Sequence, residues 1–128
     1  MNVVDSSGWL EFFDLGPNGD YFSPPILDLE NLLVPTIVLL EVHRRLLRES
    51  DEDRVLDAMI AMRQGTLVAL DETLAVQAAE LGVRHRLPLA DSIVYAVARK
   101  FQGTVWTQDS DFEGLEGVEY LPKQRAAP

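Results

Sequence analysis

Short apolar runs alternate along this chain with longer stretches in which apolar residues recur every three or four positions. The short runs favour β-strands, and the longer stretches favour amphipathic helices. The predicted strands are "NVVD" (2–5), "LLVP" (32–35), "TLVAL" (66–70), "TVWT" (104–107) and a short edge strand, "VEYL" (118–121). The predicted helices cover residues 7–13, 25–31, 36–48, 51–64, 72–86 and 91–101.

The alternation of strands and helices predicts an α/β fold with a mainly parallel sheet of four to five strands. The strands are nearly all apolar, which is expected when helices cover both faces of a sheet. Between the elements, "LGPNGDY" (15–21) is typical of a loop, and Thr36 is a plausible N-cap for the helix that follows. We predict one domain over residues 1–122 and a loose tail over residues 123–128.

Four acidic residues stand where such a fold places its ligand site, beyond the carboxyl ends of the strands. Asp5 ends the first predicted strand, and Asp109 follows the fourth. Glu41 and Asp91 lie in early turns of helices. Carboxylates packed together repel each other, and a hard divalent cation such as Mg²⁺ or Mn²⁺ removes that conflict. The pattern therefore indicates a metal site that could polarise a phosphodiester and activate water.

Each acidic residue also has a purely structural interpretation. Asp5 could cap the first helix. Glu41 could pair with Arg45 one helical turn later, although it interrupts the apolar run "TIVLLEV" and is therefore expected near the core. Asp91 could be a helix N-cap, and residues 109–111 could form a turn. We favour the metal site because all four positions converge on one edge of the sheet.

The composition narrows the range of functions. The 128 residues contain no cysteine, which excludes disulfides and cysteine nucleophiles. No signal peptide or membrane-spanning run is evident, so we expect a soluble, cytoplasmic protein without membrane partners. The net charge of -10 argues against nucleic acid as a partner. Bound cations offset part of that charge, and Arg44 and Arg45 are candidates for phosphate contacts.

Four segments together resemble the PIN-domain ribonucleases, in particular the VapC-type toxins of toxin–antitoxin pairs. They are "VVDSS", "PTIVLLEVHRRL", "RLPLADSIVYAVARK" and "VWTQDSDF", and their order and spacing span almost the whole chain. The resemblance implies a three-layer α/β/α sandwich and a metal-dependent endoribonuclease. It further implies that the Mg²⁺ or Mn²⁺ ligands are Asp5, Glu41, Asp91 and Asp109, with Asp111, Ser6 and Thr107 as accessory residues.

The resemblance also implies partners. They are an RNA substrate, a small cognate antitoxin that blocks the site, and a second copy of the chain in a homodimer. Two alternatives remain open from the sequence: a non-catalytic binding module of the same fold, and a receiver-type signalling domain with Asp71 as the acceptor of a phosphoryl group. Cleavage of DNA would use the same site as cleavage of RNA.

Overall fold

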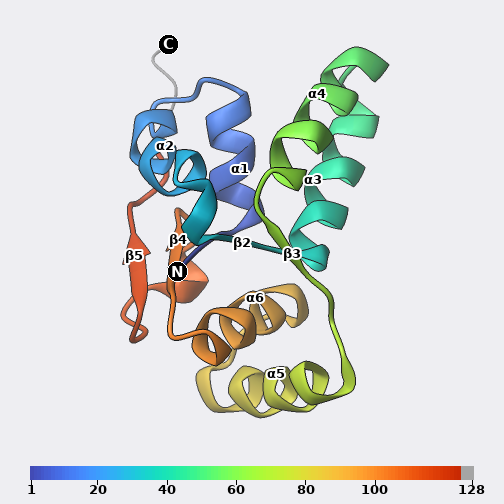
Figure 1. The fold of residues 1–128 in the computed structure, drawn as a ribbon. Coiled ribbons are helices and arrows are strands. Elements are labelled where there is room, and N and C mark those ends of the chain that lie inside the picture. Colours follow the sequence, from blue (N-terminus) through green and yellow to red (C-terminus); the bar gives the residue numbers. More distant parts are fainter. Residues whose placement is uncertain (125–128) are drawn as a thin grey trace.

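The computed structural model describes residues 1–124, which form a parallel β-sheet between two layers of helices (Figure 1). The strands are β1 (Asn2–Val4), β2 (Leu32–Pro35), β3 (Thr66–Val68), β4 (Thr104–Thr107) and β5 (Val118–Tyr120). The α-helices are α1 (Ser6–Phe13), α2 (Gly19–Leu27), α3 (Thr36–Glu49), α4 (Glu52–Arg63), α5 (Glu72–His85) and α6 (Leu89–Lys100). Two short 3₁₀ turns cover Leu29–Asn31 and Ser110–Phe112.

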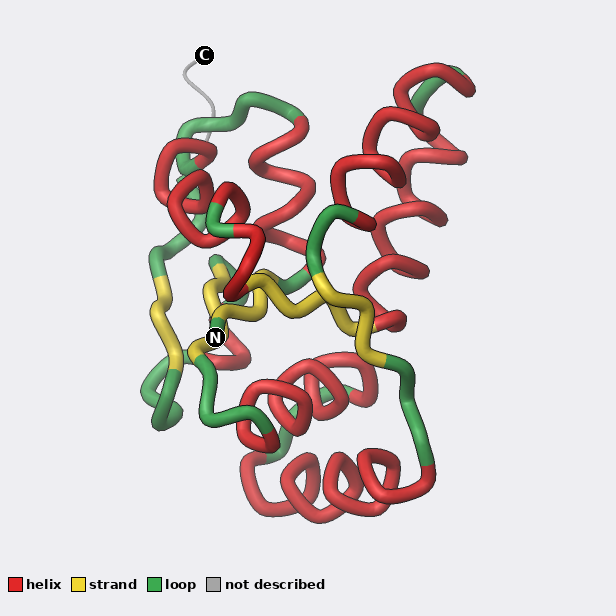
Figure 2. Tube along the Cα trace, in the orientation of Figure 1, coloured by secondary structure: helices red, strands yellow, loops and turns green. Residues whose placement is uncertain are grey.

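The sheet has the strand order β3-β2-β1-β4-β5, and every neighbouring pair is parallel. Helix α6 lies against one face of the sheet with α5 packed on its outer side, and α1 to α4 lie on the other side of the sheet (Figures 1 and 2). This arrangement confirms the predicted three-layer α/β/α fold. Five strands are present in the described part of the chain, which agrees with the predicted four to five.

The hydrophobic core lies against the central strands because these are covered on both faces. Val3, Val4 and Val34 are fully buried, and α6 buries an unbroken run, Ser92–Ala98. By contrast, the edge strand β3 is largely exposed, with 43% of the Leu67 surface accessible. The apolar strands β1, β2 and β4 therefore fix the centre of the sheet, from which the acidic residues project.

The segment between β1 and β2 differs from its prediction. We expected a loop over residues 15–21 and a helix over 25–31, whereas α2 begins at Gly19 and ends at Leu27. Two prolines suggested a helix start at Pro25, because proline favours the first turn of a helix. In the structure Phe22 and Ile26, one helical turn apart, are both buried in the core. Burial of this apolar pair outweighs the two prolines in the last part of the helix.

The other helices agree with their predictions to within two residues. The predicted N-cap Thr36 is wrong, since Pro35 occupies the cap position of α3 and no side chain caps that helix. Within the described residues, no helix is both long and apolar enough to cross a membrane. Of the predicted loose tail, residues 125–128 lie outside the described residues.

Candidate functional site

The centre of the sheet has a topological switch point between β1 and β4. From β1 the chain continues to β2 on one side, and β4 joins β1 on the other side, with Val4 paired to Trp106. In open parallel sheets the crevice beyond the carboxyl ends of two such strands is the usual ligand site. Asp5 directly follows β1, and a single residue, Gln108, separates Asp109 from the end of β4. The structure therefore places both predicted residues at this crevice.

Asp5 is held rigidly by three hydrogen bonds. Its Oδ1 accepts from the Gly8 backbone N–H (3.0 Å) and the Ser7 hydroxyl (2.7 Å). Its Oδ2 accepts from the hydroxyl of Thr107 at 2.6 Å. The cap interpretation is therefore confirmed, since Asp5 is the N-cap of α1. Capping of the helix needs only Oδ1, however, and the hydrogen bond from Thr107 of β4 fixes Oδ2.

The hydroxyl of Thr107 links the ends of the two strands. It donates to Asp5 and accepts from the backbone N–H of Asp109 at 2.9 Å. Asp109 in turn accepts from the backbone N–H of Asp111 at 2.9 Å, which forms the 3₁₀ turn over Ser110–Phe112. The turn interpretation of residues 109–111 is thus confirmed as well. Because Thr107 is fully buried, this relay sets the relative positions of the Asp5 and Asp109 carboxylates.

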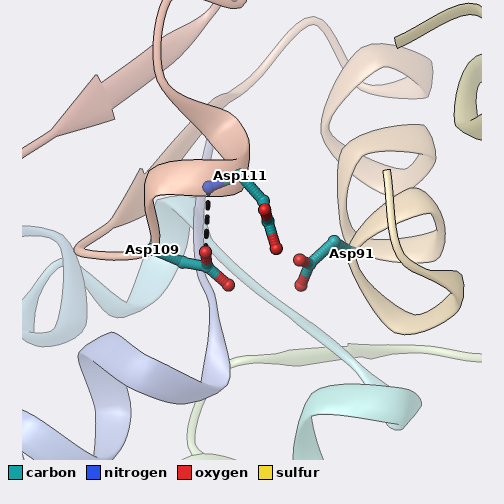
Figure 3. A group of neighbouring side chains, drawn as sticks. All are labelled: Asp91, Asp109 and Asp111. Carbon is teal, nitrogen blue, oxygen red and sulfur yellow. Dashed lines mark hydrogen bonds between the residues drawn. The ribbon is translucent and has the colours of Figure 1, made fainter. Parts of the chain in front are cut away.

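Three carboxylates form the tightest acidic group in the described part of the chain. One oxygen each from Asp91, Asp109 and Asp111 lies within 4.8 Å of the other two. Figure 3 shows the Asp91 and Asp111 carboxylates facing each other, with Asp91 reaching across from α6 and Asp111 from the turn after β4. Asp111, expected only as an accessory residue, therefore lies as close to Asp91 and Asp109 as a shared ion would require.

Asp91 occupies the first turn of α6, and its N-cap interpretation is wrong because Pro88 holds the cap position. Burial, followed by repulsion from neighbouring carboxylates with Asp109 first, raises the pKa of Asp91 to about 8. Burial also raises the pKa of Asp5 to about 6, although its three hydrogen bonds oppose that change. No ion pair within residues 1–124 compensates either charge. Protein groups alone therefore leave this site with uncompensated negative charge.

Glu41 lies on α3, half-buried and within electrostatic reach of Asp109. Burial raises its pKa, the Ser6 side chain opposes this by a hydrogen bond, and repulsion from Asp109 adds to it. Ser6 is thus placed beside Glu41, and its accessory role stays a prediction. The pairing of Glu41 with Arg45 is wrong, because Arg45 binds Glu49 at 2.6 Å instead. Glu41 therefore lies beside the acidic group, but outside the three carboxylates that approach one another within 4.8 Å in residues 1–124.

Three polar residues that support the site were not predicted from the sequence. Ser7 binds Asp5 directly, and the buried side chain of Gln108 lies between the acidic strand end and Asn18. Asn18 donates to Gln108 Oε1 and to the carbonyl of Pro122, each at 3.0 Å. The "DSS" cap pattern could have identified Ser7. No local pattern could have identified Asn18, because its partners lie at the far end of the chain.

The predicted phosphate-contact residues lie beside the acidic group. A groove of about 250 Å³ is lined by Glu41 together with Arg44, Arg45 and Arg48 of α3. Positive charge is therefore concentrated next to carboxylates in a chain whose net charge is -10. The structure thus brings the candidate carboxylates and the candidate phosphate-binding cations to the same edge of the sheet.

Comparison with solved structures identifies close matches in fold. A toxin–antitoxin complex from Klebsiella pneumoniae matches with a TM-score of 0.79 and 17% identity, over 93% of this chain and 96% of that one. The Mycobacterium tuberculosis toxin VapC20, described as cleaving the sarcin–ricin loop, matches with a TM-score of 0.77 and 23% identity, over 95% and 100%. VapBC2 from Rickettsia felis, bound to a promoter DNA fragment, matches with a TM-score of 0.73 and 11% identity, over 93% of this chain and 97% of that one.

Sequence comparison gives a family as well as a fold. No curated protein sequence matches this chain significantly. The model of the PIN domain matches residues 3–118, a range that contains every acidic residue of the site described above. From this match, and from a five-stranded parallel sheet shared with solved toxin structures, we conclude that the chain belongs to the PIN-domain family.

Proposed function

We propose that this protein is a metal-dependent endoribonuclease, acting as the toxin of a type II toxin–antitoxin pair. The observation that carries the proposal is the group formed by Asp91, Asp109 and Asp111 at the switch point of the sheet, with Asp5 and Glu41 within electrostatic reach of it. The family membership and the toxins among the structural matches support it.

The donor set fits a hard divalent cation. All candidate ligand atoms are carboxylate oxygens, which suit Mg²⁺ and Mn²⁺ rather than softer metals. The raised pKa values of Asp5 and Asp91 reflect a site that holds its charge poorly without a counterion. We propose that Asp91 and Asp109 hold the cation together with Asp5, that Asp111 assists, and that Glu41 completes the coordination.

A divalent cation bound there supplies Lewis-acid stabilisation of the phosphate and activates water for hydrolysis. The protein supplies preorganisation. Thr107 and Ser7 fix Asp5, and Thr107 also fixes the backbone at Asp109, so the carboxylates need not reorganise when substrate arrives. Arg44 and Arg45 lie beside Glu41, where they can hold RNA phosphates against the repulsion of the acidic group.

We propose RNA as the substrate and a small antitoxin as the inhibitor. The matched toxin from Mycobacterium tuberculosis is described as cleaving the sarcin–ricin loop, and another match is a toxin–antitoxin complex. A basic antitoxin side chain placed among the carboxylates would find complementary charge. A homodimer and a cytoplasmic location remain predictions on the same basis.

The alternatives have less support. A receiver-type domain would need its phosphoryl acceptor at the switch point, whereas Asp71 follows the edge strand β3 and caps α5 by accepting from the Leu74 N–H at 2.8 Å. A non-catalytic binding module does not require five converging carboxylates. Whether the protein also cleaves DNA is tested in the same assay, with a DNA strand of the same sequence in place of the RNA.

The test is cleavage of RNA by the purified, partner-free protein with Mn²⁺, with Mg²⁺ and with EDTA. We expect cleavage that requires metal and is lost in Asp91→Asn, while Asp71→Asn, which alters only the cap of α5, stays active. If metal binds, as seen by a rise in melting temperature, but no RNA is cut, the binding-module alternative is supported. Absence of both metal binding and cleavage contradicts the proposal.

A further inference from the structure

A second groove adjoins the one beside Glu41. Its volume is about 270 Å³, and its lining includes Arg45, Gln108, Asp109 and Lys123. Arg45 and Leu10 line both grooves, so the two lie side by side. Together they extend along the acidic site from Arg48 of α3 to the segment that follows β5.

Cationic side chains are distributed along both grooves, although acidic residues outnumber basic ones by 21 to 11 in the chain. Among residues 1–124, neither Arg44, Arg48 nor Lys123 forms an ion pair. The second groove is also lined by the carboxylates of Asp14, which is bound to Arg54, and of Glu11, which is buried. Its Arg45 is bound to Glu49, so Lys123 is the cation of that groove that has no ion pair among residues 1–124. Unpaired cations beside a cluster of carboxylates favour an occupant that is polyanionic and extended, as a nucleic acid strand is.

The position of Lys123 is set by a buried contact. The carbonyl of Pro122, the residue before it, accepts a hydrogen bond of 3.0 Å from Asn18 Nδ2. The same amide donates to Gln108 Oε1 at 3.0 Å, and both side chains are buried, with 2% and 7% of their surfaces exposed. The backbone that carries Lys123 is therefore attached to the residue that precedes Asp109.

We propose that the two grooves form one track for a single RNA strand and that Lys123 binds a backbone phosphate in it. This inference rests on the proposed nuclease function and adds a binding residue from the C-terminal segment. A lysine suits the position because an ammonium group neutralises a phosphate without requiring a fixed geometry. The strand would pass the acidic group between Arg44 and Lys123, so the phosphate at the metal would have cationic contacts on either side.

The chain contains one matched control, because its only other lysine is Lys100 at the end of α6. We would measure RNA cleavage by wild type, Lys123→Ala, Lys123→Arg and Lys100→Ala. Loss of a phosphate contact made equally in ground and transition states raises KM and leaves kcat unchanged. We expect KM to rise roughly fivefold in Lys123→Ala, to recover in Lys123→Arg, and to be unaltered in Lys100→Ala.

A binding measurement without turnover separates the two proposals. A fluorescein-labelled oligouridylate is titrated in Mg²⁺ against the Asp91→Asn protein with and without Lys123→Ala, over a range of salt concentrations. One lost phosphate contact lowers the slope of log K against log salt by about 0.7 for a single strand. If wild type cleaves RNA but Lys123→Ala matches Lys100→Ala in KM and slope, only the role of Lys123 is refuted. If wild type neither binds nor cleaves RNA with metal, the nuclease function and this inference both fail.

Discussion

The Thr107 hydroxyl donates a hydrogen bond of 2.6 Å to Asp5, which joins the ends of two adjacent strands from opposite ends of the chain. The same hydroxyl accepts from the N–H of Asp109. One buried oxygen thus binds the carboxylate of Asp5 and the backbone of Asp109. This relationship makes Thr107 a residue whose effect on metal binding and stability can be measured separately from the effects of the carboxylates.

Replacing Thr107 by Val keeps the shape of the side chain and removes its hydroxyl. Asp5 Oδ2 and the N–H of Asp109 then lose a buried partner, and we expect a loss of about 1–3 kcal/mol in the free energy of unfolding. Metal affinity should fall roughly tenfold or more, as when other groups that orient ligands are removed. Urea denaturation and metal titration measure the two effects. Thr107→Ser retains the hydroxyl and should stay near wild type, whereas equal effects of both variants would contradict the assigned role.

Asp5→Asn should abolish cleavage and leave the fold intact. The amide oxygen can still accept from the Gly8 N–H and the Ser7 hydroxyl, so the cap of α1 survives, and the amide nitrogen can donate to Thr107 Oγ1 where Asp5 accepted from it. Because burial raises the pKa of Asp5 to about 6, removal of its charge relieves an unfavourable burial at neutral pH. Circular dichroism and thermal denaturation should show an unchanged or slightly raised melting temperature. Full activity in this variant would show that Asp5 has only its capping role.

The metal-free protein should lose stability as the pH rises from about 4 to above 8. Asp5 and Asp91 have folded-state pKa values of about 6 and about 8, raised above the ordinary aspartate value of 3.8. A carboxyl whose pKa is raised on folding stabilises the native state below the unfolded pKa. That contribution is lost as the pH passes through the folded pKa. Urea denaturation in EDTA across this range measures the trend.

Asp91→Asn is the matched control for the pH dependence, because it removes the group with the larger shift. The difference in unfolding free energy between wild type and this variant should change most between pH 4 and about 8. A pH-independent difference would mean that Asp91 titrates normally in the folded protein.

Addition of Mn²⁺ or Mg²⁺ should stabilise the wild-type protein, and more strongly at pH 8 than at pH 6, because the ligands must be deprotonated. At a hundredfold excess over Kd we expect a rise in melting temperature of roughly 5–10 °C. Asp111→Asn should reduce this rise, since Asp111 lies within 4.8 Å of Asp91 and Asp109. The exposed Asp20 of α2 supplies the control variant Asp20→Asn. Equal responses of the two variants would exclude Asp111 from the metal site.

The sequence predicted the fold well where burial and local pattern agree. The strands at residues 32–35 and 104–107 are covered by helices, so their apolar composition correctly predicts a central position in the sheet. At α2 the two criteria disagree, since the prolines indicate a break and the burial of Phe22 and Ile26 requires a helix. Local propensity alone cannot resolve such a conflict, because burial depends on strands distant in sequence.

The site was predictable at the level of which acidic residues converge. Asp5, Asp91 and Asp109 follow from the rule that ligands bind beyond the carboxyl ends of parallel strands. The finer relationships depend on side-chain geometry that spacing does not encode. The 3₁₀ turn after β4 brings Asp111 into the tightest group. The orientation of α1 places Ser7 beside Asp5 and Ser6 beside Glu41.

The insertion of β4 beside β1 has a consequence for synthesis of the protein. A growing chain that ends before Thr104 already contains Asp5, Glu41 and Asp91, but it lacks both Asp109 and the hydroxyl that orients Asp5. Folding during translation proceeds from the N-terminus, so the acidic centre is completed only after β4 and the turn that follows it have been made. For the proposed ribonuclease, a chain whose synthesis has not yet passed Asp111 therefore lacks a complete metal site.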